Sequence, residues 1–284
     1  MEPINIGSIV PAEKLHDAME KISLNKKVNI SYKDFDDRYI YSFILNKGKT
    51  EDEIDLYNTL SEFVQETIFK YYSKEFIRKK VLKLSKFNKM ENERIIDKVY
   101  KIIINEKELI IEKDYMKKEI LDYIMENNSI IIDGYLVFRS KYFNHIIERA
   151  LDKVIKDIEL EMEFHEFIYT LKDYVDNQEA QINGVNIIMN GDDFQIKDFD
   201  NIPINNDFIV FTLEELFDGD INQGDILLNT LLALMPSEIK IHIETGKENK
   251  LLNILKVIFE DRLTICNGCN LCYMDIIKNK MDKS

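Results

Sequence analysis

The sequence contains no run of eighteen apolar residues, no tryptophan, and only three cysteines among its 284 residues. The first absence argues against a transmembrane helix, because about 20 consecutive apolar residues are needed to cross a bilayer. The N-terminal segment MEPINIGSIVPAEK has no basic region followed by an apolar core, so no secretory signal is expected. An odd number of cysteines in a chain without such a signal predicts reduced thiols and a cytoplasmic protein.

Positive charge is also scarce, since 38 Lys and Arg residues face 52 Asp and Glu residues, for a formal net charge of −14. This imbalance argues against nonspecific binding of the whole chain to nucleic acid or to an anionic membrane. An apolar share of 45% and a charged share of 32% are typical of a globular protein with a sizeable core. The length suits one large domain or two ordinary domains.

The stretch 133–178 has no proline and no glycine after Gly134, and its apolar residues recur every three or four positions. This spacing predicts a half-buried α-helix at the centre of a helical layer. After Met162 the apolar stripe moves to a different face, which leaves three explanations open: a bend near residues 161–163, a break into two helices, or partners on both faces. The first stripe comprises Phe143, Ile147, Ala150, Val154, Ile158 and Met162, and the second comprises Phe164, Ile168, Leu171 and Val175.

Patterning elsewhere predicts an α+β fold in three parts: a small N-terminal α/β unit at 1–48, a helical region at 49–180 and a C-terminal α/β unit at 181–284. Whether the two α/β units share one sheet is left open. A capping-box spacing between Thr50 and Glu53 predicts the start of the first middle helix. The other expected helices lie at 11–22, 74–84, 92–104, 113–126, 225–235 and 248–259. The expected strands lie at 4–9, 28–32, 39–45, 185–189, 194–197, 207–211, 239–243 and 262–266, with an acidic turn at Asp34, Asp36 and Asp37 and a tight turn at Asn190-Gly191.

All three cysteines lie within seven residues after the last expected strand, as Cys266, Cys269 and Cys272. Two successive Cys-x-x-Cys spacings let thiolates converge on one cation, and Gly268 permits the tight turn this requires. The expected helix at 248–259 between the strands at 239–243 and 262–266 predicts that these strands form a parallel pair. His242 is the candidate fourth ligand, because it would point to the same face of the neighbouring strand as Cys266. The pattern predicts a structural metal, with zinc favoured. An iron–sulfur cluster, a redox dithiol and ordinary surface thiols are the alternatives.

The segment Lys70–Lys101 carries eleven Lys or Arg residues against four Asp or Glu residues. Its lysines could contact nucleic acid or another anionic partner, and the candidate binding residues are Lys79, Lys80, Lys83 and Lys86. A solvated helix face, or one paired with acidic residues of the same chain, is the favoured interpretation, so nucleic acid is not the expected partner.

Several catalytic and ligand-binding patterns can be rejected. His165-Glu166 lacks the second histidine of a zinc-protease helix, and Gly246-Lys247 lacks the upstream glycine of a phosphate loop. The segment 218–229 resembles a calcium loop, but its glycine is one position late and Asn229 stands where a glutamate belongs. Without a nucleophile elbow, the sequence favours a non-enzymatic protein.

One further set of motifs lies at residues 132–135, 138–142, 163–168, 171–175, 178–179, 239–242, 262–266 and 268–269. These motifs resemble those of the YtxC-like family of sporulation proteins from endospore-forming Firmicutes. The resemblance is good over residues 130–280 and covers the N-terminal half in outline, with Ser140 and Asp173 as small departures. It implies a cytoplasmic role linked to sporulation, but no biochemical activity. We therefore expect a scaffold or interaction protein with an unidentified protein partner.

Overall fold

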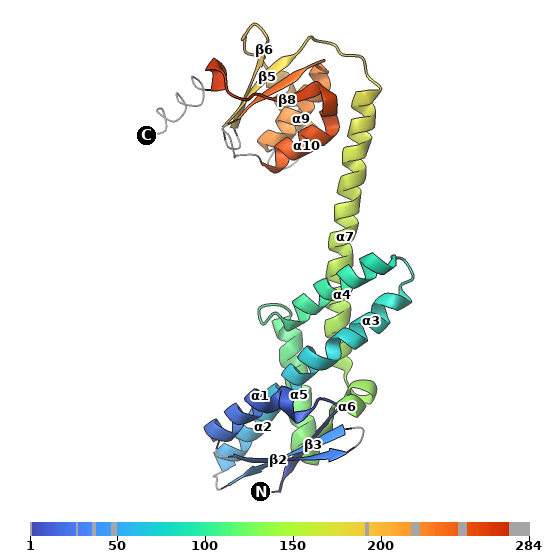
Figure 1. Cartoon of the computed structure of the whole chain (residues 1–284), viewed down its shortest axis with the longest axis vertical. Helices are drawn as coiled ribbons and strands as arrows, with labels where there is room; N and C mark the ends of the chain where they lie inside the picture. The colour runs from blue at the N-terminus through green and yellow to red at the C-terminus, as the bar shows by residue number, and fades with distance from the viewer. Residues whose placement is uncertain are drawn as a thin grey trace. The chain divides into compact units, whose positions relative to one another are not determined.

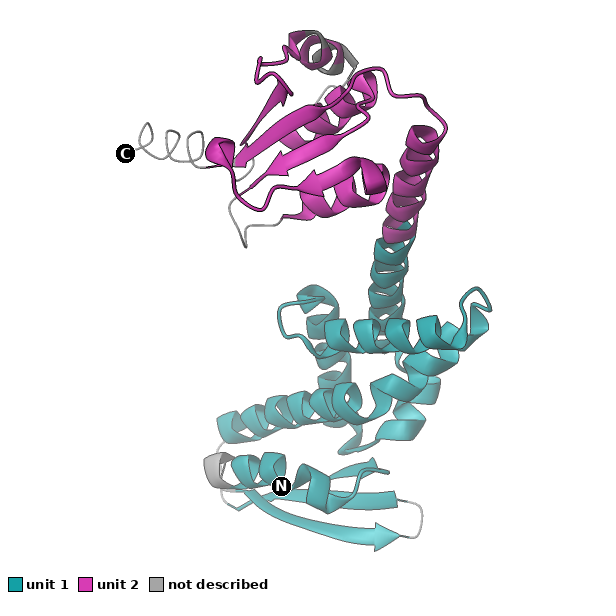
Figure 2. Cartoon of the chain, turned by 45° about the horizontal axis from the view of Figure 1, so that its top comes forward, with its two compact units in different colours: residues 1–159 teal, residues 160–284 magenta. Residues whose placement is uncertain are grey.

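The computed structural model describes residues 2–26, 28–35, 38–46, 50–190, 193–216, 222–243 and 249–272. The chain divides into two compact units, Met1–Glu159 and Leu160–Ser284 (Figures 1 and 2). Each unit contains a four-stranded sheet and its own apolar core. The abundance of helices beside two small mixed sheets confirms the predicted α+β class. Across the described ranges, no helix is both long enough and apolar enough to cross a membrane.

The sheet of the first unit has the strand order β2-β3-β1-β4. The strands β1 (Ile4–Ser8) and β3 (Arg38–Leu45) pair antiparallel, and β3 also pairs antiparallel with β2 (Val28–Phe35). A strand that the sequence patterns missed, β4 (Ser129–Ile131), pairs parallel with β1. The alternating residues Ile4 and Ile6 of β1 are fully buried, so one face of this sheet supports the core.

Helices complete the first unit and cover the core-facing residues of its sheet. They are α1 (Ala12–Lys26), α2 (Thr50–Thr67), α3 (Ser73–Lys83), α4 (Lys89–Ile104), α5 (Ile110–Asn127) and α6 (Ile132–Phe138), with a π-helical turn at Ile68–Tyr72. Helix α2 contacts α5, and α3 contacts α4. Helix α2 already includes Thr50, so the predicted boundary differs by one residue. A complete capping box, with Asn88 and Glu91 bonding to each other's backbone amides, begins α4.

The organising helix is α7 (Lys141–Asp176), a continuous helix of 36 residues. The first apolar stripe up to Ile158 belongs to the core of the first unit, where Phe143, Ile147 and Ala150 are fully buried. Its last predicted member, Met162, is exposed instead. Ile168 and Val175, from the second stripe, belong to the core of the second unit. The change of phase therefore marks the passage of one helix from one core to another, and a break at residues 161–163 is not observed.

The sheet of the second unit has the strand order β6-β5-β7-β8. The strands β5 (Val185–Asn190) and β6 (Asp193–Asp198) form the predicted hairpin. The strands β7 (Ile239–His242) and β8 (Leu263–Ile265) extend the sheet in parallel with β5, which confirms the predicted parallel pair. Helices α9 (Gln223–Leu234) and α10 (Lys250–Phe259) supply the apolar residues that pack on this sheet.

One predicted strand is wrong, because residues 207–211 lie in helix α8 (Asp207–Leu216). The side-chain oxygen of Asn205 accepts a hydrogen bond from the backbone N–H of Asp207 at 2.7 Å, which favours a helix start. Helix α8 also contacts α9. A short run of apolar residues is compatible with either structure, and here the local turn and the tertiary contact favour the helix.

The two α/β parts do not share a sheet, because β1, β2 and β3 are joined by β4, whereas β5 and β6 are joined by β7 and β8. Several sequence predictions lie outside the described residues. They are Asp36 and Asp37 of the acidic turn, Gly191 of the tight turn, the rejected calcium-loop positions Asp218 and Asp220, and the rejected Gly246-Lys247 pair. Asp34, which was also predicted in the acidic turn, lies instead in strand β2, so the strand is longer than predicted.

Candidate metal centre

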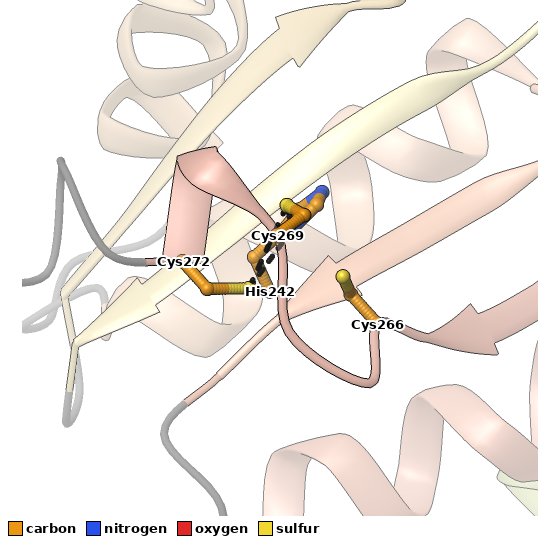
Figure 3. A group of neighbouring side chains, drawn as sticks. All are labelled: His242, Cys266, Cys269 and Cys272. Carbon is orange, nitrogen blue, oxygen red and sulfur yellow. Dashed lines mark hydrogen bonds between the residues drawn. The ribbon is translucent and has the colours of Figure 1, made fainter.

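The four predicted ligands lie at the carboxyl ends of two neighbouring parallel strands. His242 is the last residue of β7, and Cys266 directly follows β8. The backbone N–H of Cys266 donates to the carbonyl of Ile241 at 2.8 Å, which continues the pairing of the two strands. Because Ile241 pairs with Ile265, the next residues, His242 and Cys266, emerge on the same face. Residues 266–272, here called the cysteine knuckle, then fold back over this edge (Figure 3).

The knuckle brings three sulfur atoms to one imidazole. The Sγ atoms of Cys269 and Cys272 each lie 3.3 Å from Nδ1 of His242, and they lie 3.8 Å from each other. Cys266 stands slightly apart (Figure 3), but one potential ligand atom from each of the four residues lies within 4.8 Å of the others. The structure therefore brings together all four residues that the sequence selected.

These separations suit a small tetrahedral ion. With Zn–S bonds of about 2.3 Å and Zn–N bonds of about 2.0 Å, two sulfur ligands lie about 3.8 Å apart, and a sulfur and a nitrogen about 3.5 Å apart. Cys269, Cys272 and His242 already have nearly these spacings. A small adjustment of Cys266, which is only partly buried, would complete the set.

His242 is held in a form that suits metal binding. Its side chain is 1% exposed, and burial, reinforced by the charges of Lys240 and Lys197, lowers the pKa of His242. The imidazole is therefore neutral near pH 7, which is the state that can donate a lone pair to a metal. The second ring nitrogen, Nε2, lies 3.0 Å from the side-chain oxygen of Asn186 on β5.

Two of the thiols differ in their affinity for protons. Burial alone raises the pKa of Cys269, but hydrogen bonds from the backbone of Cys272, the side chain of Cys266 and the backbone of Leu271 outweigh it and leave the pKa lowered. Burial raises the pKa of Cys272 to about 11, and the neighbouring thiols add to this rise. Of these two residues, Cys269 is thus the one more readily present as the thiolate that metals bind.

The turn of the knuckle depends on Gly268, whose φ of +117° is rarely adopted by residues with a side chain. We expect Gly268→Ala to cost about 1–3 kcal/mol through backbone strain alone, because no atom lies within 4 Å of the added Cβ. This cost corresponds to roughly a 5- to 150-fold weaker affinity for zinc if metal binding requires the native turn. Competition with a chromophoric chelator measures the change.

The matched control is Gly134→Ala in helix α6, where the added Cβ would approach only Ile131, at 3.9 Å. This variant should bind zinc like the wild type. Equal zinc affinities for Gly268→Ala and the wild type would show that the turn conformation does not govern the site.

The candidate binding lysines lie in the first unit. Lys79 pairs with Glu75 at 2.6 Å and Lys80 with Glu148 at 2.6 Å. Lys86 pairs with Glu159 at 2.7 Å, whereas Lys83 is an exposed residue at the end of α3. Internal acidic residues thus offset part of the positive charge, in line with the favoured interpretation of a helix face paired within the chain. An anionic partner for these lysines stays the alternative.

Sequence reasoning missed Asn186, which contacts the candidate metal ligand His242. A signal was present, since Asn186 interrupts the otherwise apolar start of β5, and asparagine is depleted in strands. The residue is buried, so its polar atoms need partners. Only the paired strands reveal that one of those partners is His242.

Fold and site together define an α+β protein with a candidate Cys₃His metal centre at the end of its second sheet. The model of the YtxC-like family matches residues 57–264, which is well over half of the chain. The chain therefore belongs to the YtxC-like family, as its sequence motifs predicted. The matched region includes Asn186 and His242 and ends before Cys266.

A curated relative is the Uncharacterized protein YtxC of Bacillus subtilis (strain 168), which is 23% identical over 151 residues. The alignment covers 52% of this chain and 53% of the relative, so the chain spans about half the length of that protein. No solved structure matches the chain.

Proposed function

We propose that the cysteine knuckle and His242 bind one structural zinc ion, which stabilises the β8 edge of the second sheet. The observation that carries this proposal is the convergence of four ligand atoms within 4.8 Å. Sulfur and imidazole nitrogen are the ligands that zinc prefers in closed tetrahedral sites. Four protein ligands leave no position for a substrate, so the ion would act in stability rather than in catalysis.

The edge strand β8 is the element that such an ion would stabilise. Strand β8 has only three residues, and very short edge strands contribute few hydrogen bonds to a sheet. A metal bound by His242 of β7 and by the three cysteines that follow β8 would tie the two strands together. Its binding free energy would then contribute directly to the folding of this part of the second unit.

At the level of the cell, we propose a non-enzymatic interaction protein that acts in the cytoplasm during sporulation. Support comes from the resemblance of the sequence motifs to sporulation proteins and from membership of the YtxC-like family. Partly exposed aromatic residues on α7, among them Phe164 and Phe167, provide apolar surface for a protein partner. Purification of the tagged chain from sporulating cells, with identification of the proteins that bind to it, tests this role. If no protein co-purifies specifically, the role is contradicted.

Elemental analysis of protein purified without oxygen or chelators tests the zinc proposal. We expect close to one zinc ion per chain and a tetrahedral absorption spectrum after replacement of zinc by cobalt. Protein that is free of metal, and that takes up neither ion on addition, would refute the site.

A redox dithiol is the second candidate, because the Sγ atoms of Cys269 and Cys272 lie only 3.8 Å apart. In that case the protein would contain no zinc, and the two thiols would be oxidised and reduced reversibly. An iron–sulfur cluster would instead give iron, sulfide and a visible absorption band. The same purified sample distinguishes these outcomes.

A further inference from the structure

Asn186 lies between two polar partners inside the second unit. Its side-chain nitrogen Nδ2 donates to the backbone carbonyl of Asp198 on β6 at 3.1 Å. Its side-chain oxygen Oδ1 lies 3.0 Å from Nε2 of His242. Because a carbonyl can only accept, the bond to Asp198 fixes the orientation of the amide and directs its oxygen to the histidine.

This orientation determines which nitrogen of His242 carries the proton. An amide oxygen only accepts hydrogen bonds, so Nε2 must be the protonated nitrogen of the neutral ring. The lone pair then belongs to Nδ1, the nitrogen 3.3 Å from the sulfur atoms of both Cys269 and Cys272. The tautomer chosen by Asn186 is therefore the one that directs a free lone pair toward the thiols.

We propose that Asn186 is a positioning residue for the metal centre, and that it selects Nδ1 of His242 as the metal-binding nitrogen. This inference rests on the proposed function, and it adds a residue that binds no metal itself. Hydrogen bonds from a second layer of residues orient histidine ligands and raise their basicity, and their loss typically lowers metal affinity by about 10- to 100-fold.

The arrangement also links the metal centre to a part of the sheet that supplies no ligand. Asn186 belongs to β5 and is bonded to β6, while His242 belongs to β7. A bound ion would therefore be connected through one imidazole and one amide to the β5–β6 hairpin, as well as to β8 through Cys266.

The test compares the full-length wild type with Asn186→Leu, in which the side chain has a similar size but cannot accept a hydrogen bond. We expect zinc affinity, measured by competition with a chelator, to fall by about 10- to 100-fold in the variant. Asn186→Asp restores an acceptor oxygen, and its zinc affinity should be closer to that of the wild type. Thr230→Val removes another buried polar group of this unit, one bonded to the carbonyl of Ile226, and should leave zinc affinity unchanged.

A measurement on the wild type keeps the inference testable even if Asn186→Leu does not fold. Long-range proton–nitrogen correlation spectra of the zinc-loaded protein should show Nε2 of His242 protonated and Nδ1 bound to zinc. Zinc bound through Nε2, or unchanged affinity in a folded Asn186→Leu variant, overturns this inference alone. A wild type that binds no zinc overturns the proposed function as well.

Discussion

Replacement of Cys269 by serine is expected to lower zinc affinity by roughly 10²- to 10³-fold. Structural zinc sites with four ligands bind with about 10–16 kcal/mol, so one ligand accounts for roughly 2.5–4 kcal/mol. Cys269 is the informative choice, because its sulfur is close both to His242 and to Cys272. Serine preserves the size of the side chain, but a neutral hydroxyl does not replace a thiolate as a zinc ligand.

The loss of metal should appear as a loss of thermal stability. At free zinc about 1,000-fold above its Kd, binding stabilises the folded state by about 4 kcal/mol. Most of this stabilisation disappears if the Kd rises by a similar factor, and a loss of this size lowers the Tm of a unit of this length by on the order of 10 °C. Thermal melts of wild type and variant, each with zinc and with a chelator, measure the effect.

His165→Ala is the matched control for this experiment. His165 lies on the exposed part of α7 in the same unit, so its removal should change stability by less than about 0.5 kcal/mol. With chelator present, the wild type should have nearly the same Tm as the Cys269→Ser variant. Identical melting of wild type and variant in the presence of zinc would remove the case for a structural ion.

The metal centre shows how far local sequence can predict a site. Three cysteines within seven residues predicted the knuckle without any knowledge of the fold. The choice of His242 needed only the correct pairing of β7 with β8, and the strand–helix–strand pattern supplied it. Asn186 could not be selected in this way, because its role depends on β5 being the neighbour of β7, and the chain segments between them do not specify that order.

The fold was predictable wherever one element buries one regular face. The hairpins and the long amphipathic helices follow this rule, and the structure contains them close to the predicted boundaries. Strand β4 was missed because three residues are too few to display alternation. The only signal is a pair of β-branched residues, Ile130 and Ile131, that follows Asn127, Asn128 and Ser129. Asn128 has a φ of +48°, which ends α5 and starts the strand.

The second large expected effect concerns the part of α7 that belongs to the first unit. Phe143 is fully buried, and its ring packs edge-on against Phe76 of α3 with centroids 5.3 Å apart. We expect Phe143→Ala to destabilise the first unit by about 3–5 kcal/mol, through lost burial and the cavity left behind. Urea unfolding of the full-length protein, monitored by far-UV circular dichroism, measures the loss.

Phe164→Ala is the matched comparison, because it removes the same side chain from the same helix at a position after the apolar stripe changes face. Phe164 lies 21 positions further along the same helix, and its side chain is 48% exposed. The sequence pattern groups Phe164 with the second apolar stripe, but the structure leaves it exposed in the interval of α7 between Ile158, buried in the first core, and Ile168, buried in the second. We therefore expect a cost below about 0.5 kcal/mol for Phe164→Ala.

A large destabilisation by Phe164→Ala would mean that this interval of α7 is covered in solution, either by a second copy of the chain or by another part of it. Unfolding at two protein concentrations separates these cases, since only an intermolecular contact makes stability depend on concentration. A small effect would instead show that the apolar residues of this interval contribute nothing to folding. Their exposed surface would then be free to contact a partner. Helix α7 would be held by residues buried in each core, such as Phe143 in the first and Val175 in the second.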